Sequence, residues 1–466
     1  MTTGWALVFI VLGWQKHARC GTFGVDLGVY DQAVWLLSRL KDPFITVRGL
    51  ELFGFHMNVV LVLLAPFYRF GAGPELLLVV QVAAQASGAA AIYLLARDRL
   101  GDRWLAVALG SLLLLNPSYQ YLSWEYFHPD TLAVAPLLFA YWAASARRWG
   151  WFMVAALLAA SCKEDVALAL AVLGILIALR GDPKVGAATT ALSAAWFTVS
   201  TRVILPFGNG IGPFYESFFG DFGKTPFEVA RSVITKPGKA LRNATMPDRI
   251  NYYRMMLAPV AFLPLAALPT LAIAGPMLVI NVLSTFRYQH EIEWHYAAMV
   301  IVGIMLATVE AVTLLGRTPG SRRFLVGLLA CTSFGATVAW GPSPLSTKYH
   351  SGLWPQGPDP RRTYKVRALH TVPDRSPVSS IYYLTPHLTR RTKVYEFPVP
   401  WKPTNWGVQG ENLDNPAAVR WIAVDLQLLS GEDRALLARL LGREFEVRYH
   451  QVDMLVAKRV HPPAPQ

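Results

Sequence analysis

The sequence predicts a mostly α-helical fold, in which a bundle of about eleven membrane spans precedes a small C-terminal α/β domain. Two observations predict the bundle. The chain of 466 residues is 53% hydrophobic and only 16% charged, whereas a soluble protein has about 25% charged residues. Apolar runs that could enter a bilayer recur along roughly the first 340 residues. A third observation predicts the small domain, because residues 342–466 change to a proline-rich, charged and strand-like pattern.

Eleven apolar runs are the candidate spans, although a helix needs about 20 residues to cross the hydrocarbon core and some of these runs are shorter. A further run, 58–70, contains Pro66 and is too short to cross. We predict that it is re-entrant or lies at the interface, within a region of such helices near 26–70. The spans are predicted at residues 2–16, 75–96, 104–121, 129–146, 149–162, 165–180, 185–206, 252–268, 270–286, 296–316 and 323–340.

The short loops between these spans set the predicted orientation, because basic short loops face the cytoplasm. The basic loops are 97–103, 147–148, 180–184 and 316–323. The chain then divides into a multi-span membrane domain, 1–341, and an extracytoplasmic domain, 342–466. The remaining segments predicted outside are 17–57, 122–128, 163–164, 287–295 and the long outer loop 207–251.

The C-terminal domain is predicted from its local patterns. Alternating, β-branched and aromatic residues predict strands at 379–386, 392–398, 420–426 and 445–459. The segment ALLARLLG predicts a helix that ends at Gly442. Strands mixed with helical segments indicate a small α/β domain.

Charge and cysteine content narrow the partners and cofactors. Lys and Arg outnumber Asp and Glu, 43 to 30, but they are scattered, so the predicted partner is the lipid bilayer and not a nucleic acid. The three cysteines lie far apart, which predicts neither a disulfide framework nor a zinc site. Acids and histidines offer ligands to a divalent metal. No spacing matches a metal motif, so we assign no metal ligand and leave the cofactor open.

Ionisable residues near the membrane gather on the predicted outer side. Such residues cost about 2.5–3.5 kcal/mol each at membrane depth, so they tend to mark function. They are Asp26, Asp31, His56, Glu125, His128, Asp130, Lys163, Glu164, Asp165, Arg287, His290, Glu291, Glu293 and His295.

The segment SCKEDVA, 161–167, is the most informative of these. It divides an apolar stretch, 149–179, into halves of about 15 residues, or about 22 Å at 1.5 Å per residue, against a hydrocarbon core of roughly 30 Å. Its tip therefore lies below the outer surface, inside protein or a wet cavity. A turn in which Lys163 and Glu164 neutralise each other is the structural alternative. We favour function, because a turn seldom needs three charges at that depth.

Asp26 and His128 have structural alternatives as well. Asp26 precedes an amphipathic segment and suits a helix N-cap, and Pro129 with Asp130 suits the first turn of a helix. A histidine between Glu125 and Asp130 is less ordinary than a lone one. Basic residues in 207–251 run against the positive-inside trend. They form either a solvated face or a site for the phosphate of a lipid-linked substrate.

Several motifs in order carry a family resemblance. FGVDLGVYDQAVW, GFHMNVVLVLLAPFYR, EYFHPDTLA and SCKEDVALAL resemble the bacterial membrane family known as domain-of-unknown-function family 2079. The tail, with IYYLTPHLTRRTKVYEFP and RWIAVDL, is similar too, so the resemblance covers nearly the whole chain. The chain departs from the family at 54–57, where Gly-Asp-His-Phe is usual, and at Asp130, where Glu is usual. The missing acid beside His56 argues against a metal there.

That family resembles the class C (GT-C) glycosyltransferases, multi-span enzymes that take a sugar from a polyprenyl-phosphate donor on the outer face of the membrane. In them an acid in the first outer loop acts as base or positions the acceptor, and Asp26 occupies that place. The resemblance implies an inverting glycosyltransferase of the bacterial cytoplasmic membrane whose partner is a polyprenyl-phosphate-linked sugar. The predicted catalytic residues are Asp26, Asp31, Glu164 and Asp165. The predicted substrate-binding residues are His56, Glu125, His128, Asp130, Lys163, Arg202, Arg287 and His295.

Two other functions compete with sugar transfer. A transporter or flippase for a lipid-linked or polar solute usually shows repeats and midplane sites at broken helices. Here no repeat is found, and the polar groups lie toward one face. A receptor or scaffold that binds a partner through its outer domain would keep its function in the tail alone. We therefore rank transfer first and transport second.

Overall fold

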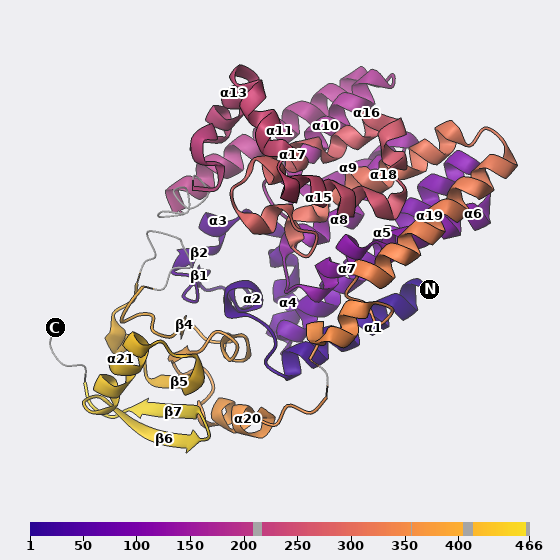
Figure 1. The fold of residues 1–466 in the computed structure, drawn as a ribbon. Helices are drawn as coiled ribbons and strands as arrows, with labels where there is room; N and C mark the ends of the chain where they lie inside the picture. Colours follow the sequence, from indigo (N-terminus) through magenta and orange to yellow (C-terminus); the bar gives the residue numbers. More distant parts are fainter. Residues whose placement is uncertain (208–216, 356, 404–412, 463–466) are drawn as a thin grey trace.

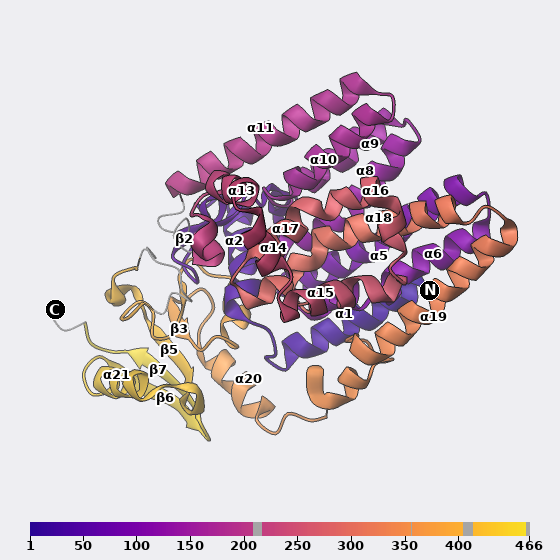
Figure 2. The same cartoon turned by 45° about the horizontal axis from the view of Figure 1, so that its top comes forward.

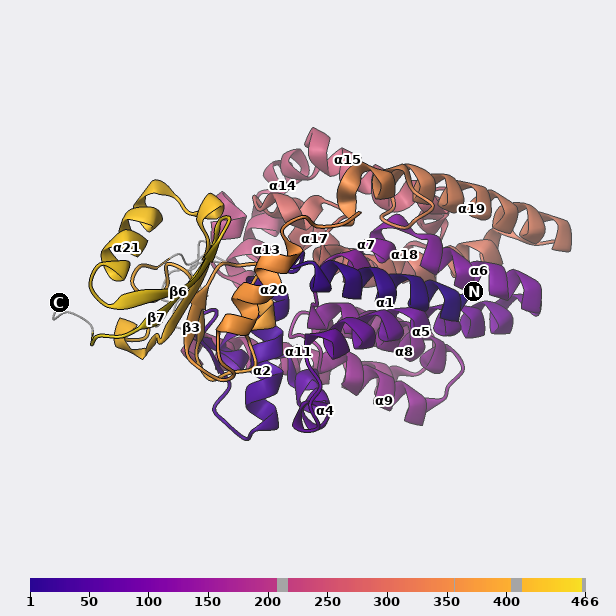
Figure 3. The same ribbon diagram turned by 90° about the horizontal axis from the view of Figure 1, so that it is seen from below.

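The computed structural model describes residues 1–207, 217–355, 357–403 and 413–462. It is mostly helical, and the C-terminal residues add a small mixed sheet. Figure 1 shows the helices as one body with the sheet beside it. Figure 3 shows the sheet at one end of the molecule and the long helices extending away from it. The predicted combination of a helical membrane body and a C-terminal sheet is therefore confirmed.

Four helical stretches are long and apolar enough to cross a membrane within the described ranges. They are α5 (Pro74–Leu100), Leu263–Leu283, His295–Leu315, which contains α18 (Ala298–Leu315), and α19 (Pro319–Trp340). Buried residues make up 78% of the apolar window in His295–Leu315 but 28% of that in α19. A helix that is apolar on all sides is normally buried, so α18 belongs to the core. The exposed apolar face of α19 suits contact with lipid.

Further helices, most of them shorter, occupy the other predicted spans. The predicted span 104–121 is broken at Asn116, whose side chain accepts a hydrogen bond from the Tyr119 backbone N–H at 3.2 Å and so begins a new helix at Pro117. These helices are α1 (Thr2–Ala18), α6 (Arg103–Leu115), α7 (Pro117–Trp124), α8 (Val134–Ser145), α9 (Trp149–Ala160), α10 (Val166–Leu179) and α11 (Pro183–Phe207).

The region predicted as spans 252–268 and 270–286 divides at a different place. The chain turns at Ala261 and Phe262, whose φ angles are 50° and 57°, and then continues as one helical stretch, Leu263–Leu283. This stretch contains α16 (Leu268–Leu271) and α17 (Gly275–Leu283) joined by 3₁₀ turns. Prolines within the apolar run remove backbone donors and favour such interruptions, and composition alone does not show where the reversal falls.

Helix ends that carry the basic short loops contact one another. Arg99, at the end of α5, pairs with Glu310 near the end of α18 at 2.9 Å. Arg147, after α8, pairs with Asp182, after α10, at 3.2 Å. These contacts agree with a single face for the basic loops.

The segment after α1 is folded between the helical body and the sheet. It contains a π-helical turn η1 (Gly24–Gly28), α2 (Val29–Ser38), the two-stranded pair β1 (Phe44–Ile45) and β2 (Leu50–Glu51), α3 (Leu52–Phe55), the 3₁₀ helix η2 (Val59–Leu64) and α4 (Ala65–Arg69). Residues in α2 are buried almost throughout. The prediction of an amphipathic helix with one solvated face is therefore wrong for this segment.

The C-terminal sheet has the strand order β4-β3-β5-β7-β6. Strand β3 lies parallel to both β4 and β5, whereas β7 runs antiparallel to both β5 and β6. The elements are α20 (Arg362–Thr371), β3 (Val378–Ser380), β4 (Val394–Glu396), β5 (Trp421–Asp425), α21 (Gly431–Leu441), β6 (Phe445–Gln451) and β7 (Met454–Arg459). Each predicted strand region contains a strand, and α21 has Gly442 at its C-cap as predicted.

The sheet is docked onto the segment after α1 by side chains. Thr46 Oγ1 donates to the carbonyl of Val394 at 2.7 Å and accepts from its N–H at 2.9 Å. Because β4 is an edge strand, Thr46 satisfies backbone groups that would otherwise be exposed.

Three short helices between residues 226 and 257 cover part of the helical body (Figure 2). They are α13 (Pro226–Thr235), α14 (Pro237–Ala244) and α15 (Pro247–Leu257). The first part of the predicted loop 207–251, residues 208–216, lies outside the described residues.

Candidate functional site

Nine of the twelve predicted site residues lie on six segments at the ends of helices, beside the C-terminal domain. The segments are η1, His56 directly after α3, the turn after α7, the 3₁₀ turn η3 (Pro129–Ala133), the loop 161–165 and the 3₁₀ turn η9 (His295–Ala297). Phe23 links the two parts of the molecule, since its ring centroid lies 5.8 Å from Tyr126 and 5.0 Å from Tyr382 in the C-terminal domain.

A central cluster consists of Glu125, His128 and His295. One Glu125 oxygen lies 2.9 Å from His295 Nδ1 and 3.3 Å from His128 Nε2, and the other accepts from the backbone N–H of His295 at 2.5 Å. The two imidazole rings stack with their centroids 3.7 Å apart. The side chains of Glu125 and His128 are almost fully buried, so this is a desolvated group of charges.

Burial and charge oppose each other in this cluster. Burial alone would raise the pKa of Glu125, but the charges of His295 and His128 and their hydrogen bonds lower it to about 2. Burial alone would lower the pKa of His128, but Glu125, Asp26 and Asp130 raise it to about 9. Both shifts favour an ionised Glu125 and a protonated His128 at neutral pH.

Asp26 borders this cluster and is more accessible than its other members. Its Oδ1 lies 3.8 Å from His128 Nε2, and its side chain is 27% exposed, compared with 8% for His128. Burial raises the pKa of Asp26, the charge of His128 opposes the rise, and solvent at the exposed part moderates it. The predicted N-cap role is not seen, because no side-chain cap hydrogen bond is made at the start of η1 or α2.

A second set of charges extends the network to the KED segment. Lys163 Nζ lies 3.4 Å from Asp130 Oδ2 and 3.1 Å from Asp165 Oδ2. Glu164 pairs with His56 Nδ1 at 2.8 Å and accepts from the backbone N–H of residue 57 at 3.1 Å. Burial would raise the pKa of Glu164, but His56 lowers it to about 2. Nine predicted site residues thus form one network: Asp26, His56, Glu125, His128, Asp130, Lys163, Glu164, Asp165 and His295.

The other three predicted residues lie elsewhere. Asp31 is fully buried and accepts hydrogen bonds from Tyr68, at 2.6 Å, and from Thr389 of the C-terminal domain. Arg202 is exposed on α11. Arg287 is exposed and pairs with Glu291. Asp31 therefore connects α2 to Tyr68 of α4 and to Thr389 near the C-terminal sheet, and the two arginines do not reach the network.

Residues that the motifs do not contain complete the site. Lys16, buried at the end of α1, donates to the carbonyl of Trp124 at 2.9 Å, and its charge lies near those of Glu125 and Asp26. Gln81 of α5 holds the turn between α7 and η3, because its amide donates to Leu122 and Tyr126 carbonyls and accepts from the His128 N–H at 2.9 Å. In the sequence, Lys16 could have been identified as a charged residue at the end of an apolar run. Nothing in the sequence distinguishes Gln81 from the other polar residues of its helix.

The central cluster also fits a metal ion. Glu125, His128 and His295 each offer one ligand atom, and these atoms lie within 4.8 Å of one another. Two imidazoles and one carboxylate form a ligand set that zinc enzymes use with an open position for substrate. The sequence predicted no metal ligands because Glu125 and His295 are 170 residues apart, and no short motif can include both.

A family model described as "Predicted membrane protein (DUF2079)" matches residues 17–450. This chain belongs to the DUF2079 family. The match confirms the resemblance seen in the motifs, and it includes every residue of the charged network. No curated protein matches the chain.

Solved structures similar to this DUF2079 protein include two that align with nearly the whole chain. ArnT from Cupriavidus metallidurans in the apo state is 13% identical with a TM-score of 0.44, and the alignment covers 98% of each chain. The Archaeoglobus fulgidus oligosaccharyltransferase, in complex with Zn and sulfate, is 12% identical with a TM-score of 0.41. That alignment covers 98% of this chain and 73% of the other.

Proposed function

We propose that this DUF2079 protein is a membrane glycosyltransferase that moves a sugar from a polyprenyl-phosphate donor to an acceptor at the outer face of the membrane. One observation carries the proposal. Asp26 is a part-exposed carboxylate at the edge of a buried network of charges, where the membrane helices end and the C-terminal domain begins. Ionisable groups placed at such a depth favour a functional site over a structural one.

In the proposed reaction Asp26 accepts the proton of the acceptor hydroxyl. The acceptor oxygen forms a bond to the anomeric carbon while the bond from that carbon to the phosphate oxygen breaks. The electron pair of the broken bond leaves with polyprenyl phosphate, and attack from the opposite side inverts the anomeric configuration.

Positive groups beside Asp26 would offset the charge of the leaving phosphate. His128 is the nearest of these, at 3.8 Å, and Lys16 lies close enough to interact with Asp26 electrostatically. Lys163 is held between Asp130 and Asp165, so we assign it to positioning the network. If Glu125, His128 and His295 hold a divalent cation, His128 must be neutral, and the cation would supply the positive charge in its place.

The proposal is tested by donor turnover. Purified protein in lipid nanodiscs is offered a panel of polyprenyl-phosphate sugars, and release of polyprenyl phosphate is followed for wild type and Asp26→Asn. Loss of a general base reduces turnover by about 10²–10⁴-fold. Asp42→Asn is the matched control, because Asp42 lies on the same outer segment but is exposed.

Two outcomes contradict the proposal. Equal turnover by wild type and Asp26→Asn would remove this residue from the mechanism. No release from any donor, together with saturable counterflow of a lipid-linked or polar solute in liposomes, would place transport first.

A further inference from the structure

A polar cavity lies at the opposite ends of α8 and α10 from the charged network. Helix α8 follows the η3 turn that contains Asp130 and ends at Ser145, and α10 begins next to Asp165 and ends at Leu179. Beyond those ends is a cavity of about 110 Å³. One water needs about 10–15 Å³ of such space, so a group of phosphate size can enter. The lining includes Arg99, Tyr141, Ser145, Arg147, Arg180 and Asp182.

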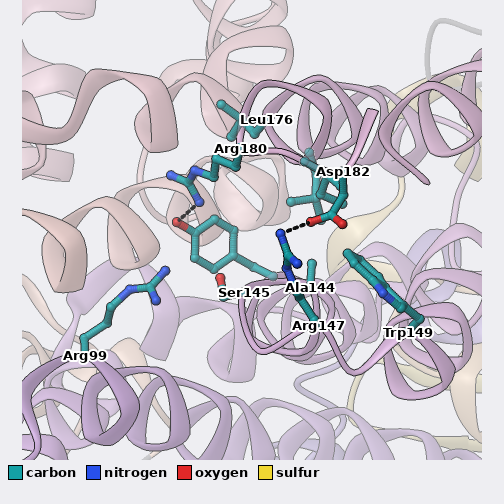
Figure 4. A pocket seen from close by; sticks show the side chains of 11 residues that line it. Arg99, Ala144, Ser145, Arg147, Trp149, Leu176, Arg180 and Asp182 are labelled. Carbon is teal, nitrogen blue, oxygen red and sulfur yellow. Dashed lines mark hydrogen bonds and ion pairs between the residues drawn. The ribbon is translucent and has the colours of Figure 1, made fainter. Parts of the chain in front are cut away.

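Three guanidinium groups face this cavity from separate helix ends (Figure 4). Arg147 pairs with Asp182 at 3.2 Å, and its side chain is 64% exposed. Arg99 makes a two-pronged contact with Glu310, at 3.1 Å from Nε and 2.9 Å from Nη2. Two carboxylates therefore balance two of the three arginines.

Arg180 is the arginine that remains without a carboxylate among the described residues. Its two terminal nitrogens donate to neutral hydroxyls, Tyr141 Oη at 2.8 Å and Thr270 Oγ1 at 3.0 Å. Tyr141 in turn donates to Glu310 at 2.7 Å. These bonds hold the guanidinium plane in place at the cavity and leave its charge uncompensated by an ion pair.

We propose that this cavity binds the phosphate group of an anionic phospholipid from the leaflet at the basic loops. Arginine forks match phosphate oxygens in charge and geometry, and basic pockets between helices on the cytoplasmic side bind lipid head groups. The inference does not depend on the proposed transfer reaction, because no residue of the charged network takes part.

The surroundings favour a lipid as the source of the phosphate. Leu179, next to Arg180, is 79% exposed, and Trp151 of α9 is 67% exposed. Trp149 lines the cavity itself. Exposed apolar side chains next to a phosphate-sized polar cavity suit acyl chains with an attached head group, and tryptophan is common at the level of lipid head groups.

The test uses native mass spectrometry of the detergent-solubilised full chain with phosphatidylglycerol, and with phosphatidylcholine as the zwitterionic comparison. Arg180→Ala and Arg147→Ala should each weaken phosphatidylglycerol retention about tenfold, because each removes a charge-assisted contact. Asp182→Asn should strengthen retention, since it removes a competing carboxylate. Arg323→Ala is the control, an exposed arginine at a basic loop that does not line the cavity.

The pattern of variants decides the proposal. Equal retention of phosphatidylglycerol by all four variants and wild type would overturn it, as would equal retention of the two lipids. If Arg180→Ala does not fold, the other two variants still test the proposal. Arg147→Ala should weaken phosphatidylglycerol retention, whereas Asp182→Asn should strengthen it. Competition by inorganic phosphate with the same dependence on these residues would support a phosphate site and refute the lipid as its source.

Discussion

The buried carboxylate of Asp31 gives a prediction whose size follows from its surroundings. It is fully buried between Tyr68 and Thr389, and both hydroxyls donate to it. Burial raises its pKa from 3.8 to about 6, while the two hydrogen bonds oppose the rise. Between these two values the folded protein holds a proton that the unfolded chain has released. The wild type therefore loses about 3 kcal/mol of stability as the pH rises through this range.

Asp31→Asn removes that dependence because asparagine does not ionise. Hydroxyl groups donate or accept, so Tyr68 and Thr389 can rotate to suit the amide, with a loss of about 1 kcal/mol for a weaker hydrogen bond. Above pH 7 the variant should be about 2 kcal/mol more stable than wild type. At pH 4 the difference should vanish or reverse. Asp31→Asn should also retain transfer activity, because Asp31 lies apart from the network.

The assay is denaturant unfolding in mixed micelles between pH 4 and pH 8, followed by tryptophan fluorescence, with Asp374→Asn as the exposed control. The informative quantity is the difference in midpoint between variant and wild type at each pH. A variant that is less stable by the same amount at every pH would refute the reasoning, since the ionised carboxylate would then be the stabilising form.

Three further predictions concern the site. Gly24→Ala should reduce transfer, by less than loss of the Asp26 carboxylate, because a Cβ there displaces the end of the flexible Glu396 side chain and lies 3.0 Å from the Cβ of Thr385; Gly4→Ala, which meets nothing within 4 Å, should have no effect. Glu125→Gln should lower zinc binding about tenfold in equilibrium dialysis with metal analysis, since one of three ligands is lost. His56→Ala should lower the free energy of unfolding by about 3 kcal/mol, because it leaves Glu164 buried without its partner.

Each of these has a result that would contradict it. Full transfer by Gly24→Ala would mean that the backbone near Asp26 tolerates displacement. Unchanged zinc affinity in Glu125→Gln would exclude this carboxylate as a ligand. Equal stability of His56→Ala and His56→Gln, which keeps a donor, would show that the hydrogen bond to Glu164 contributes little.

Sequence patterns predicted most elements because apolar length and strand alternation are local properties. Likewise, Lys163, Glu164 and Asp165 stood out because three charges interrupt one apolar stretch, and all three belong to the network. The pairing of Glu125 with His295 could not be predicted, since it depends on how α7 and α18 pack. The burial of Asp31 was also hidden, because Thr389 comes from the far end of the chain. Local patterns thus located the charged segments, whereas the residues that pair with them are determined by tertiary packing.

The docking of β4 onto Thr46 limits how early in synthesis the segment after α1 can fold. Gly24, two residues before Asp26, donates its N–H to the carbonyl of Tyr382 at 3.0 Å, so the segment after α1 is completed by residues synthesised more than three hundred positions later. Domains fold as the chain emerges, the N-terminal part first. Here the segment after α1 cannot complete its contacts until the C-terminal residues have been synthesised. In a chain truncated before the tail, the membrane helices are complete but the Asp26 segment lacks its contacts with the tail.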